Sequence, residues 1–119
     1  MNVYVDSSVL LRVVLGEPEP LAVWRRIDRA VSSEIIRLEC LRTIDRARHE
    51  LRLPDEAVSQ TRGDVLDALD GFGLIGLTAQ VLERAAEPFP TLIGSLDAIH
   101  LTSALLVRQQ YEDLQHCRG

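Results

Sequence analysis

The stretch of sequence that decides the fold is Val3-Tyr4-Val5-Asp6-Ser7-Ser8-Val9-Leu10-Leu11. Residues 2–6 form a predicted short buried strand, and residues 7–15 form a predicted helix, because serines suited to capping precede an apolar run. A carboxylate, Asp6, therefore lies where a strand ends and a helix begins. Ligands bind at this edge of the sheet in α/β folds, although Asp also caps helices for purely structural reasons.

The rest of the chain alternates strands with helices. After the first strand and the first helix, which we expect Gly16 to end, the apolar spacing predicts a helix from Glu17, a strand at 30–33, a helix from Glu34 that Pro54 ends, and a helix at 55–69. A strand at 72–77 that is buried on both faces follows, and then a helix at 79–87 capped by Thr78 and a helix at 95–108. This order predicts an α/β fold with a parallel sheet and right-handed crossovers.

Composition excludes several classes of function. A net charge of −5 and few aromatic residues argue against a nucleic-acid-binding module without chemistry. The basic residues are all Arg, so mechanisms that need a lysine amine are excluded, and Arg is left to grip phosphate. We expect Arg12, Arg25, Arg26 and Arg42 to lie on elements near the predicted site.

The cysteines and the N-terminus indicate an intracellular protein. Cys40 and Cys117 have no metal-ligand spacing, and Cys40 fits a buried packing position. Trp24 falls in an apolar helical repeat and is interpreted as core. The sequence has no signal-peptide pattern and no apolar run long enough for a membrane span, so we expect a cytoplasmic protein with no membrane association.

Two later carboxylates give Asp6 a chemical context. Glu39 borders the apolar face of its helix, although pairing with Arg42 would also explain it. Asp97 opens the last predicted helix on a face that continues with Leu101, where an unpaired carboxylate is costly. Because all three elements meet the carboxyl edge of the predicted sheet, we expect Asp6, Glu39 and Asp97 to converge.

Converging carboxylates need a cation. Each pair at a separation of about 5 Å repels by roughly 3 kcal/mol at an effective dielectric near 20. The hard oxygen donors suit Mg²⁺, or Mn²⁺, rather than zinc. His100 is interpreted as a packed neighbour able to bond Asp97, not as a metal ligand. An ion held by few carboxylates keeps waters for chemistry, so the pattern predicts metal-assisted hydrolysis of phosphodiesters.

Three segments resemble the successive acidic motifs of PIN-domain proteins: residues 3–11, residues 33–42, and residues 95–104, whose Asp-Ala-Ile-His-Leu run is the most specific. The most similar subgroup is the ribonuclease toxins of the VapBC toxin–antitoxin type. The resemblance covers about residues 1–108. It implies a three-layer α/β/α sandwich, a Mg²⁺-dependent endoribonuclease, a homodimer, and a cognate antitoxin that blocks the site.

The resemblance also implies roles for single residues. Asp6, Glu39 and Asp97 match the catalytic, metal-binding acids of the family, and Ser7 matches the small hydroxyl residue that helps to order the first acid.

The chain departs from the family after residue 108. A further strand and a fourth acid usually follow, but residues 109–119 have no strand signal, so we divide the chain into a PIN-like domain (1–108) and a diverged or truncated tail (109–119). In the family the missing strand lies beside the first strand. We therefore expect weakened metal binding, lower stability, or completion of the sheet by another chain.

Two other functions fit parts of the sequence. A phosphotransferase that forms an aspartyl-phosphate would need an acid at the position of Ser8, or a lysine. A degenerate PIN domain, catalytically weak or inactive but able to bind an antitoxin, stays open as the main alternative.

Overall fold

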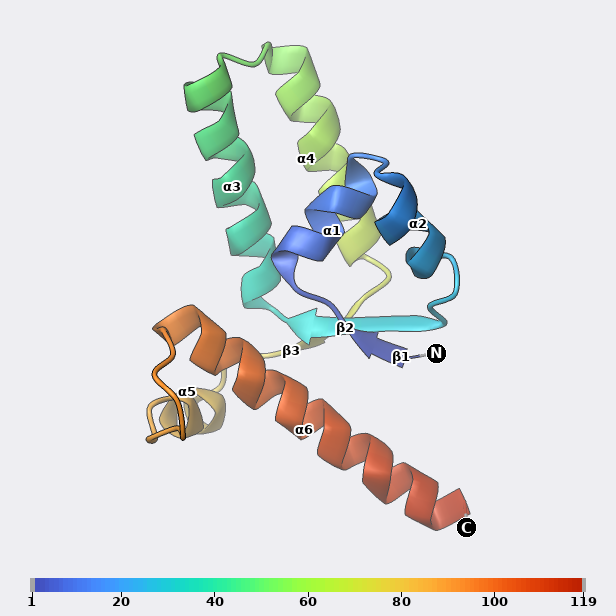
Figure 1. The fold of residues 1–119 in the computed structure, drawn as a ribbon, viewed down its shortest axis with the longest axis vertical. Coiled ribbons are helices and arrows are strands. Elements are labelled where there is room, and N and C mark those ends of the chain that lie inside the picture. Colours follow the sequence, from blue (N-terminus) through green and yellow to red (C-terminus); the bar gives the residue numbers. More distant parts are fainter. Residues whose placement is uncertain (1, 119) are drawn as a thin grey trace.

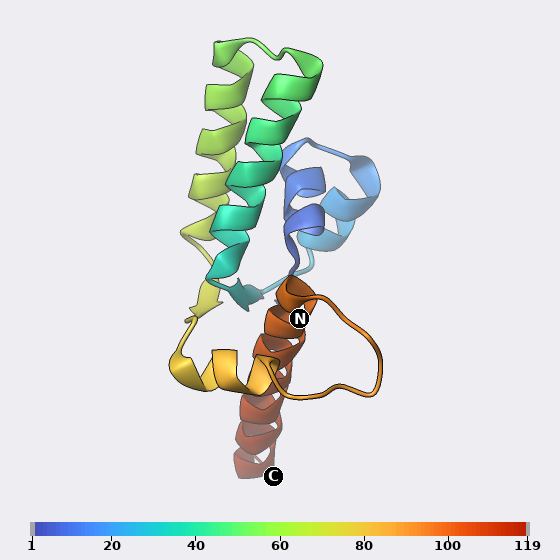
Figure 2. The same ribbon diagram turned by 90° about the vertical axis from the view of Figure 1, so that its left-hand side faces the viewer.

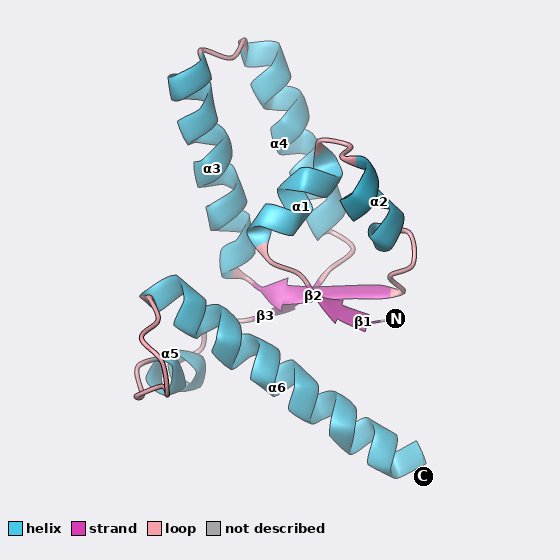
Figure 3. Cartoon of the chain, viewed as in Figure 1, coloured by secondary structure: helices cyan, strands magenta, loops and turns pink. Residues whose placement is uncertain are grey.

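The computed structural model describes the backbone of residues 2–118 and the side chains of residues 2–110. The chain alternates strands and helices as its apolar pattern predicts (Figure 3). In chain order the elements are β1 (Asn2–Tyr4), α1 (Ser7–Val14), α2 (Pro18–Trp24), β2 (Arg29–Ser33), α3 (Ile35–Leu51), α4 (Asp55–Leu69), β3 (Gly73–Ile75), α5 (Ala79–Ala85) and α6 (Ser95–Arg118).

The strands form one parallel sheet in the order β1-β2-β3. Val3 is paired with Ala30, and Ser33 with Ile75. Helices α1 to α4 lie on one face of the sheet, and α5 and α6 lie on the other (Figure 1). The predicted α/β sandwich is therefore confirmed, and no strand follows β3 within residues 2–118.

The main core lies between the sheet and helices α1 to α4. Alternation along β1 directs Val3 and Val5 into this core, where the buried residues are Val5, Leu10, Ala30, Ile36, Cys40, Ile44, Val65 and Leu69. Cys40 is fully buried, and Trp24 packs against the core beside Phe72, with ring centroids 5.7 Å apart. Both residues therefore have the packing roles that the sequence predicted.

The opposite face of the sheet is covered by α6. This helix packs against β2 and buries Ala98, Thr102, Ser103 and Val107. Because Tyr4 alternates with Val3 and Val5, its side chain lies on this second face of the sheet, where it reaches α6.

Two local predictions about helix ends hold. Gly16 follows the C-cap of α1 with φ +79°, a conformation that glycine adopts without strain. Its N–H donates to Val13 O, and the N–H of Glu17 donates to Arg12 O, so α1 ends in a Schellman motif. Thr78 caps α5 through a hydrogen bond that its hydroxyl accepts from the N–H of Val81.

Two other predictions need correction. Strand β3 is shorter than residues 72–77 and is not buried on both faces, because it lies at the edge of the sheet and its Leu74 is 43% exposed. Helix α6 continues past Arg108 to Arg118, since no Gly or Pro interrupts the sequence between those residues. Within the part of the chain that was described, no helix has the length and apolar content of a membrane span.

Candidate active site

Three helices begin at the same edge of the sheet. The first turns of α1, α3 and α6 lie around the carboxyl end of β2, and two perpendicular views agree on this arrangement (Figures 1 and 2). These turns carry or adjoin the predicted acids: Asp6 precedes α1, Glu39 lies in the second turn of α3, and Asp97 lies in the first turn of α6. The topology therefore brings the three acidic segments to one end of the sheet.

Asp6 is the N-cap residue of α1. Its Oδ1 accepts a hydrogen bond from the backbone N–H of Val9 at 2.9 Å and another from the hydroxyl of Ser8 at 2.8 Å. The Asp6 side chain is exposed, and Oδ2 makes no described hydrogen bond within residues 2–110. The hydroxyl that bonds Asp6 is thus that of Ser8, while the ordering role assigned to Ser7 stays a prediction.

Glu39 makes its contact across the sheet edge, with α6. Its Oε1 lies 2.5 Å from Nε2 of His100, and both side chains are mostly buried, with 17% and 15% exposed. This contact replaces both pairings that the sequence offered. Arg42 pairs with Asp45 instead of Glu39, and His100 bonds Glu39 instead of Asp97.

Tyr4 completes a chain of hydrogen bonds behind Glu39. Its Oη lies 2.7 Å from Nδ1 of His100 and accepts the backbone N–H of Ser33 at 3.1 Å. The Tyr4 and His100 rings meet edge to face, with centroids 5.9 Å apart and an interplanar angle of 81°. One connected set of contacts therefore ties together β1, β2, α3 and α6.

The sequence predicted Tyr4 only as a strand residue. A signal was nevertheless present, because a Tyr between two core valines faces away from their core and needs a partner for its hydroxyl. Burial raises the pKa of Tyr4, and the charge of Glu39 raises it further. Hydrogen bonds from three serines lower this pKa in part; they come from the side chain of Ser32, the backbone of Ser33 and the side chain of Ser103.

The buried thiol of Cys40 lies near both Asp6 and Glu39. Burial raises the pKa of its thiol to about 12, and the charges of Glu39 and then Asp6 act in the same direction. The Cys40 Sγ also lies 3.8 Å from the carbonyl oxygen of Ser7, at the start of α1. Two of the predicted acids therefore lie near enough to one buried thiol to affect it.

Asp97 is placed differently from Glu39. It is exposed, and within residues 2–110 no described hydrogen bond or ion pair involves it. It precedes His100 by three residues, so the two share one side of α6. Since His100 contacts Glu39, Asp97 lies one helical turn from that contact.

The donor chemistry of the three acids fits a hard divalent cation. Carboxylate oxygens suit Mg²⁺ or Mn²⁺, and Asp6 and Glu39 each use one oxygen in the hydrogen bonds above and keep the other for a ligand. Among the residues whose side chains are described, no three His, Cys, Asp or Glu side chains form a group able to hold a metal. The convergence of all three acids on one ion therefore stays a prediction.

Of the arginines expected near the site, Arg12 and Arg42 lie on helices that begin there, α1 and α3, whereas Arg25 and Arg26 do not. Arg12, in the last turn of α1, pairs with Glu17 at 3.2 Å. Arg25 and Arg26 follow α2, which leads into the amino end of β2, at the edge opposite the acids (Figure 1). Arg42 and Arg48 both pair with Asp45, and the hydrogen bond from Arg48 is the main cause of the lowered pKa of Asp45.

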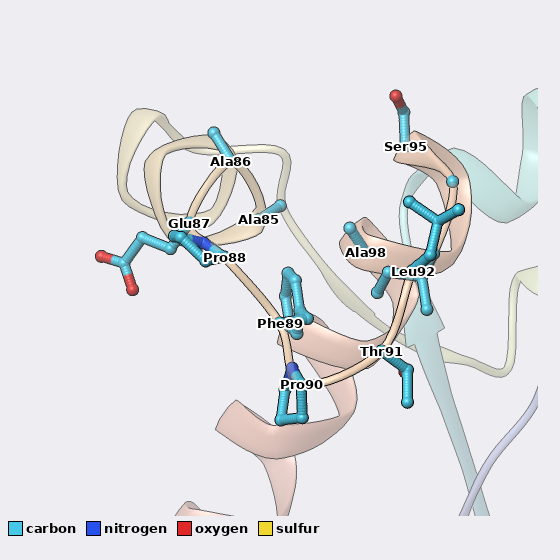
Figure 4. A pocket seen from close by; sticks show the side chains of 12 residues that line it. Ala85, Ala86, Glu87, Pro88, Phe89, Pro90, Thr91, Leu92, Ser95 and Ala98 are labelled. Atoms are coloured by element: carbon cyan, nitrogen blue, oxygen red, sulfur yellow. The ribbon is translucent and has the colours of Figure 1, made fainter.

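An open pocket adjoins the first turn of α6. The segment from Ala85 to Ser95 curves around it, and Ala98 forms part of its wall, giving a cavity of about 490 Å³. Figure 4 shows the ring of Phe89 lying between the end of α5 and Ala98. Since Ser95 and Ala98 line the pocket and flank Asp97, this cavity lies beside one of the predicted acids.

Comparisons with known proteins agree with this arrangement. The sequence pattern of the PIN domain matches residues 3–110. The chain is also 30% identical over 115 residues to "Ribonuclease VapC47" from Mycobacterium tuberculosis (strain CDC 1551 / Oshkosh), an alignment that covers 91% of this chain and 78% of that protein. The PIN-domain match spans the three segments that carry Asp6, Glu39 and Asp97.

Proposed function

The chain belongs to the PIN-domain family, and we propose that it is a metal-dependent endoribonuclease toxin of a toxin–antitoxin pair, hydrolysing phosphodiester bonds of RNA in the cytoplasm. The observation that carries the proposal is the contact between Glu39 and His100, which joins the second and third acidic segments at the sheet edge where Asp6 begins α1. The similarity to a ribonuclease over most of the chain supports the choice of RNA as substrate.

Asp6, Glu39 and Asp97 would hold a Mg²⁺ or Mn²⁺ ion. When bound, such an ion activates a water molecule for attack on phosphorus and offsets the negative charge of the phosphate. The chain's own contribution is to hold the carboxylates. The cap geometry of α1 fixes Asp6 Oδ1, and His100 fixes Glu39 Oε1, so that the second oxygen of each of these two acids would be left for the ion.

The RNA would approach along the pocket beside α6. Phe89 supplies an aromatic ring, and the pocket wall includes the first turn of α6, which carries Asp97. Aromatic side chains bind unpaired bases by stacking, and the bound cation would offset the charge of the phosphate. This suits a protein whose net charge is −5.

The proposal includes protein partners. We propose a homodimer and a cognate antitoxin that covers the site, in line with the similarity to a VapC protein. Leu96, Leu101 and Leu105 of α6 are 48%, 41% and 38% exposed, and such apolar residues on one helix support a role for α6 in protein contacts. Sedimentation equilibrium of the wild type and of Leu101→Ser tests this role, with a more monomeric variant expected.

One observation favours a second candidate, a PIN domain that binds an antitoxin but cleaves RNA weakly or not at all. The described side chains contain no group of three metal ligands, and Asp97 is exposed. A site that does not close around its ion would bind it weakly.

A cleavage assay separates the two candidates. Purified protein is incubated with total cellular RNA, with and without Mg²⁺ or Mn²⁺, beside an Asp97→Asn variant shown by circular dichroism to be folded. Discrete cleavage that requires the metal and is lost in Asp97→Asn supports the nuclease. A folded wild type that leaves RNA intact with either metal supports the inactive, antitoxin-binding candidate.

A further inference from the structure

We propose that Tyr4 and His100 form a positioning pair that sets the orientation of the Glu39 carboxylate for metal binding. The inference rests on the proposed function, because it assigns a purpose to contacts that surround a proposed metal ligand. In this proposal His100 acts through its contact with Glu39, and Tyr4 acts through its contact with His100. Neither residue would contact the ion or the RNA.

The hydrogen bonds of Tyr4 and His100 have a consistent direction. The backbone N–H of Ser33 donates to Tyr4 Oη, which leaves the phenolic hydrogen available for His100 Nδ1. A carboxylate only accepts, so His100 Nε2 carries the hydrogen that it donates to Glu39 Oε1. A neutral imidazole satisfies both contacts with Nδ1 as acceptor and Nε2 as donor.

This arrangement restrains the Glu39 side chain. Glu39 and His100 are mostly buried, and Ser33 anchors Tyr4 through its backbone, which is part of β2. The edge-to-face contact with Tyr4 restrains the His100 ring as well. A glutamate has three side-chain torsions, and without these contacts its carboxylate would sample several orientations.

The second carboxylate oxygen of Glu39 is left for a ligand. His100 occupies only Oε1 of Glu39, so Oε2 stays available on a carboxylate that is already oriented. Hydrogen-bonded partners of this kind orient the ligands of a metal site, and their loss commonly reduces metal affinity or activity by about 10- to 100-fold. His100 is therefore needed for metal affinity without being a ligand.

The test measures Mn²⁺ affinity by calorimetry in the wild type, His100→Ala, His100→Gln and Tyr4→Phe. We expect His100→Ala to weaken binding by about 10- to 100-fold, and His100→Gln to restore part of the loss, since its amide donates to the same carboxylate oxygen. Tyr4→Phe keeps the ring but removes the hydroxyl, and a several-fold loss is expected. His49→Ala is the matched control, because His49 is exposed and lies near Asp45 instead of the site.

Melting temperatures and ¹⁵N shifts distinguish positioning from a merely structural role. In the metal-free wild type, Tyr4→Phe should change the ¹⁵N shifts of the His100 ring, because it removes the hydroxyl that contacts Nδ1. Folded His100→Ala and Tyr4→Phe variants that bind Mn²⁺ as the wild type does would overturn the inference. If His100→Ala does not fold, Tyr4→Phe decides alone.

The inference and the proposed function fail in different ways. A wild type that binds Mn²⁺ but does not cleave RNA overturns the nuclease, and the affinities of the variants still decide the role of His100. A wild type that cleaves RNA while His100→Ala retains both its Mn²⁺ affinity and its kcat overturns only the positioning pair. A wild type that binds no Mn²⁺ overturns both.

Discussion

Glu39 Oε1 and His100 Nε2 lie 2.5 Å apart, although the two residues are separated by 61 positions in the chain. Glu39 belongs to a helix on one face of the sheet, and His100 to the helix that covers the other. The contact therefore links the two helical layers at the edge of the sheet where α1 also begins. Any change that separates α6 from β2 would also release the Glu39 carboxylate.

Two substitutions of Asp6 separate its capping role from its proposed chemical role. Asn is as good an N-cap as Asp, whereas Ala forms no cap, so only Asp6→Ala should lose stability, by about 1 kcal/mol. Both variants should lose metal-dependent RNA cleavage, because neither keeps the carboxylate. Urea unfolding and the RNA assay measure the two effects. Retention of cleavage by Asp6→Asn would show that Asp6 is only a cap.

Much of the fold follows from local sequence patterns. The alternation of strands and helices, the glycine stop at Gly16, the capping Thr78 and the burial of Cys40 are all present as predicted. The acidic motifs identified the family correctly, and the PIN match over residues 3–110 confirms that identification. These features depend on residues that are near one another in the chain.

The errors arose where a contact links distant segments. His100 has Asp97 as its neighbour in sequence, but packing of α6 on β2 places its ring between Tyr4 and Glu39, 96 and 61 positions away. The apolar run that contains Leu74 suggested a central strand, yet strand order puts β3 at an edge, and order is set by tertiary packing. The division of the chain at Arg108 stays a prediction.

The thiol of Cys40 predicts a specific pH dependence of stability. Its pKa is raised from 9.0 to about 12 in the folded protein, so above pH 9 the unfolded chain releases a proton that the folded chain retains. The free energy of unfolding should then fall by up to about 1.4 kcal/mol per pH unit between these values, with no effect below pH 9.

Urea unfolding of the wild type and Cys40→Ala from pH 7 to 10.5 measures this dependence. Tyr4, whose pKa is also raised, contributes equally in both proteins. Cys40→Ala should be less stable at pH 7 because it leaves a small cavity, and its stability should decline less steeply above pH 9. Two parallel curves would contradict the assignment.

Thr102 offers a stabilising substitution. Its hydroxyl is buried, and no hydrogen-bond partner for it occurs among the side chains and backbone that the structure describes. Thr102→Val keeps the shape and removes an unsatisfied polar group, so the free energy of unfolding should rise by about 1 kcal/mol. Thermal unfolding measures the change.

Ser32→Ala is the contrasting control for Thr102→Val. Ser32 is equally buried, but its hydroxyl donates to the carbonyl oxygen of Val5 at 2.7 Å. Removing the Ser32 hydroxyl leaves the Val5 carbonyl without this hydrogen bond, so the free energy of unfolding should fall by about 1 kcal/mol. Loss of stability in Thr102→Val comparable to that in Ser32→Ala would mean that the Thr102 hydroxyl is satisfied.

Phe89 tests whether the pocket beside α6 takes part in RNA binding. Stacking of a base on an aromatic ring contributes about 1–3 kcal/mol, so Phe89→Ala should raise KM for RNA cleavage by about 5- to 150-fold. The value of kcat should change little, because the ring contributes equally to binding of the substrate and of the transition state. Phe89→Trp should retain a low KM, since indole also stacks.

The control for Phe89 is Leu15→Ala, which removes an apolar side chain that is 67% exposed at the far end of α1. Its KM should equal that of the wild type. The half-buried position of Phe89 means that Phe89→Ala could also loosen the loop before α6, and this would lower kcat through Asp97. A fall in kcat at unchanged KM would therefore assign Phe89 to the support of α6 and remove the pocket from the path of the RNA.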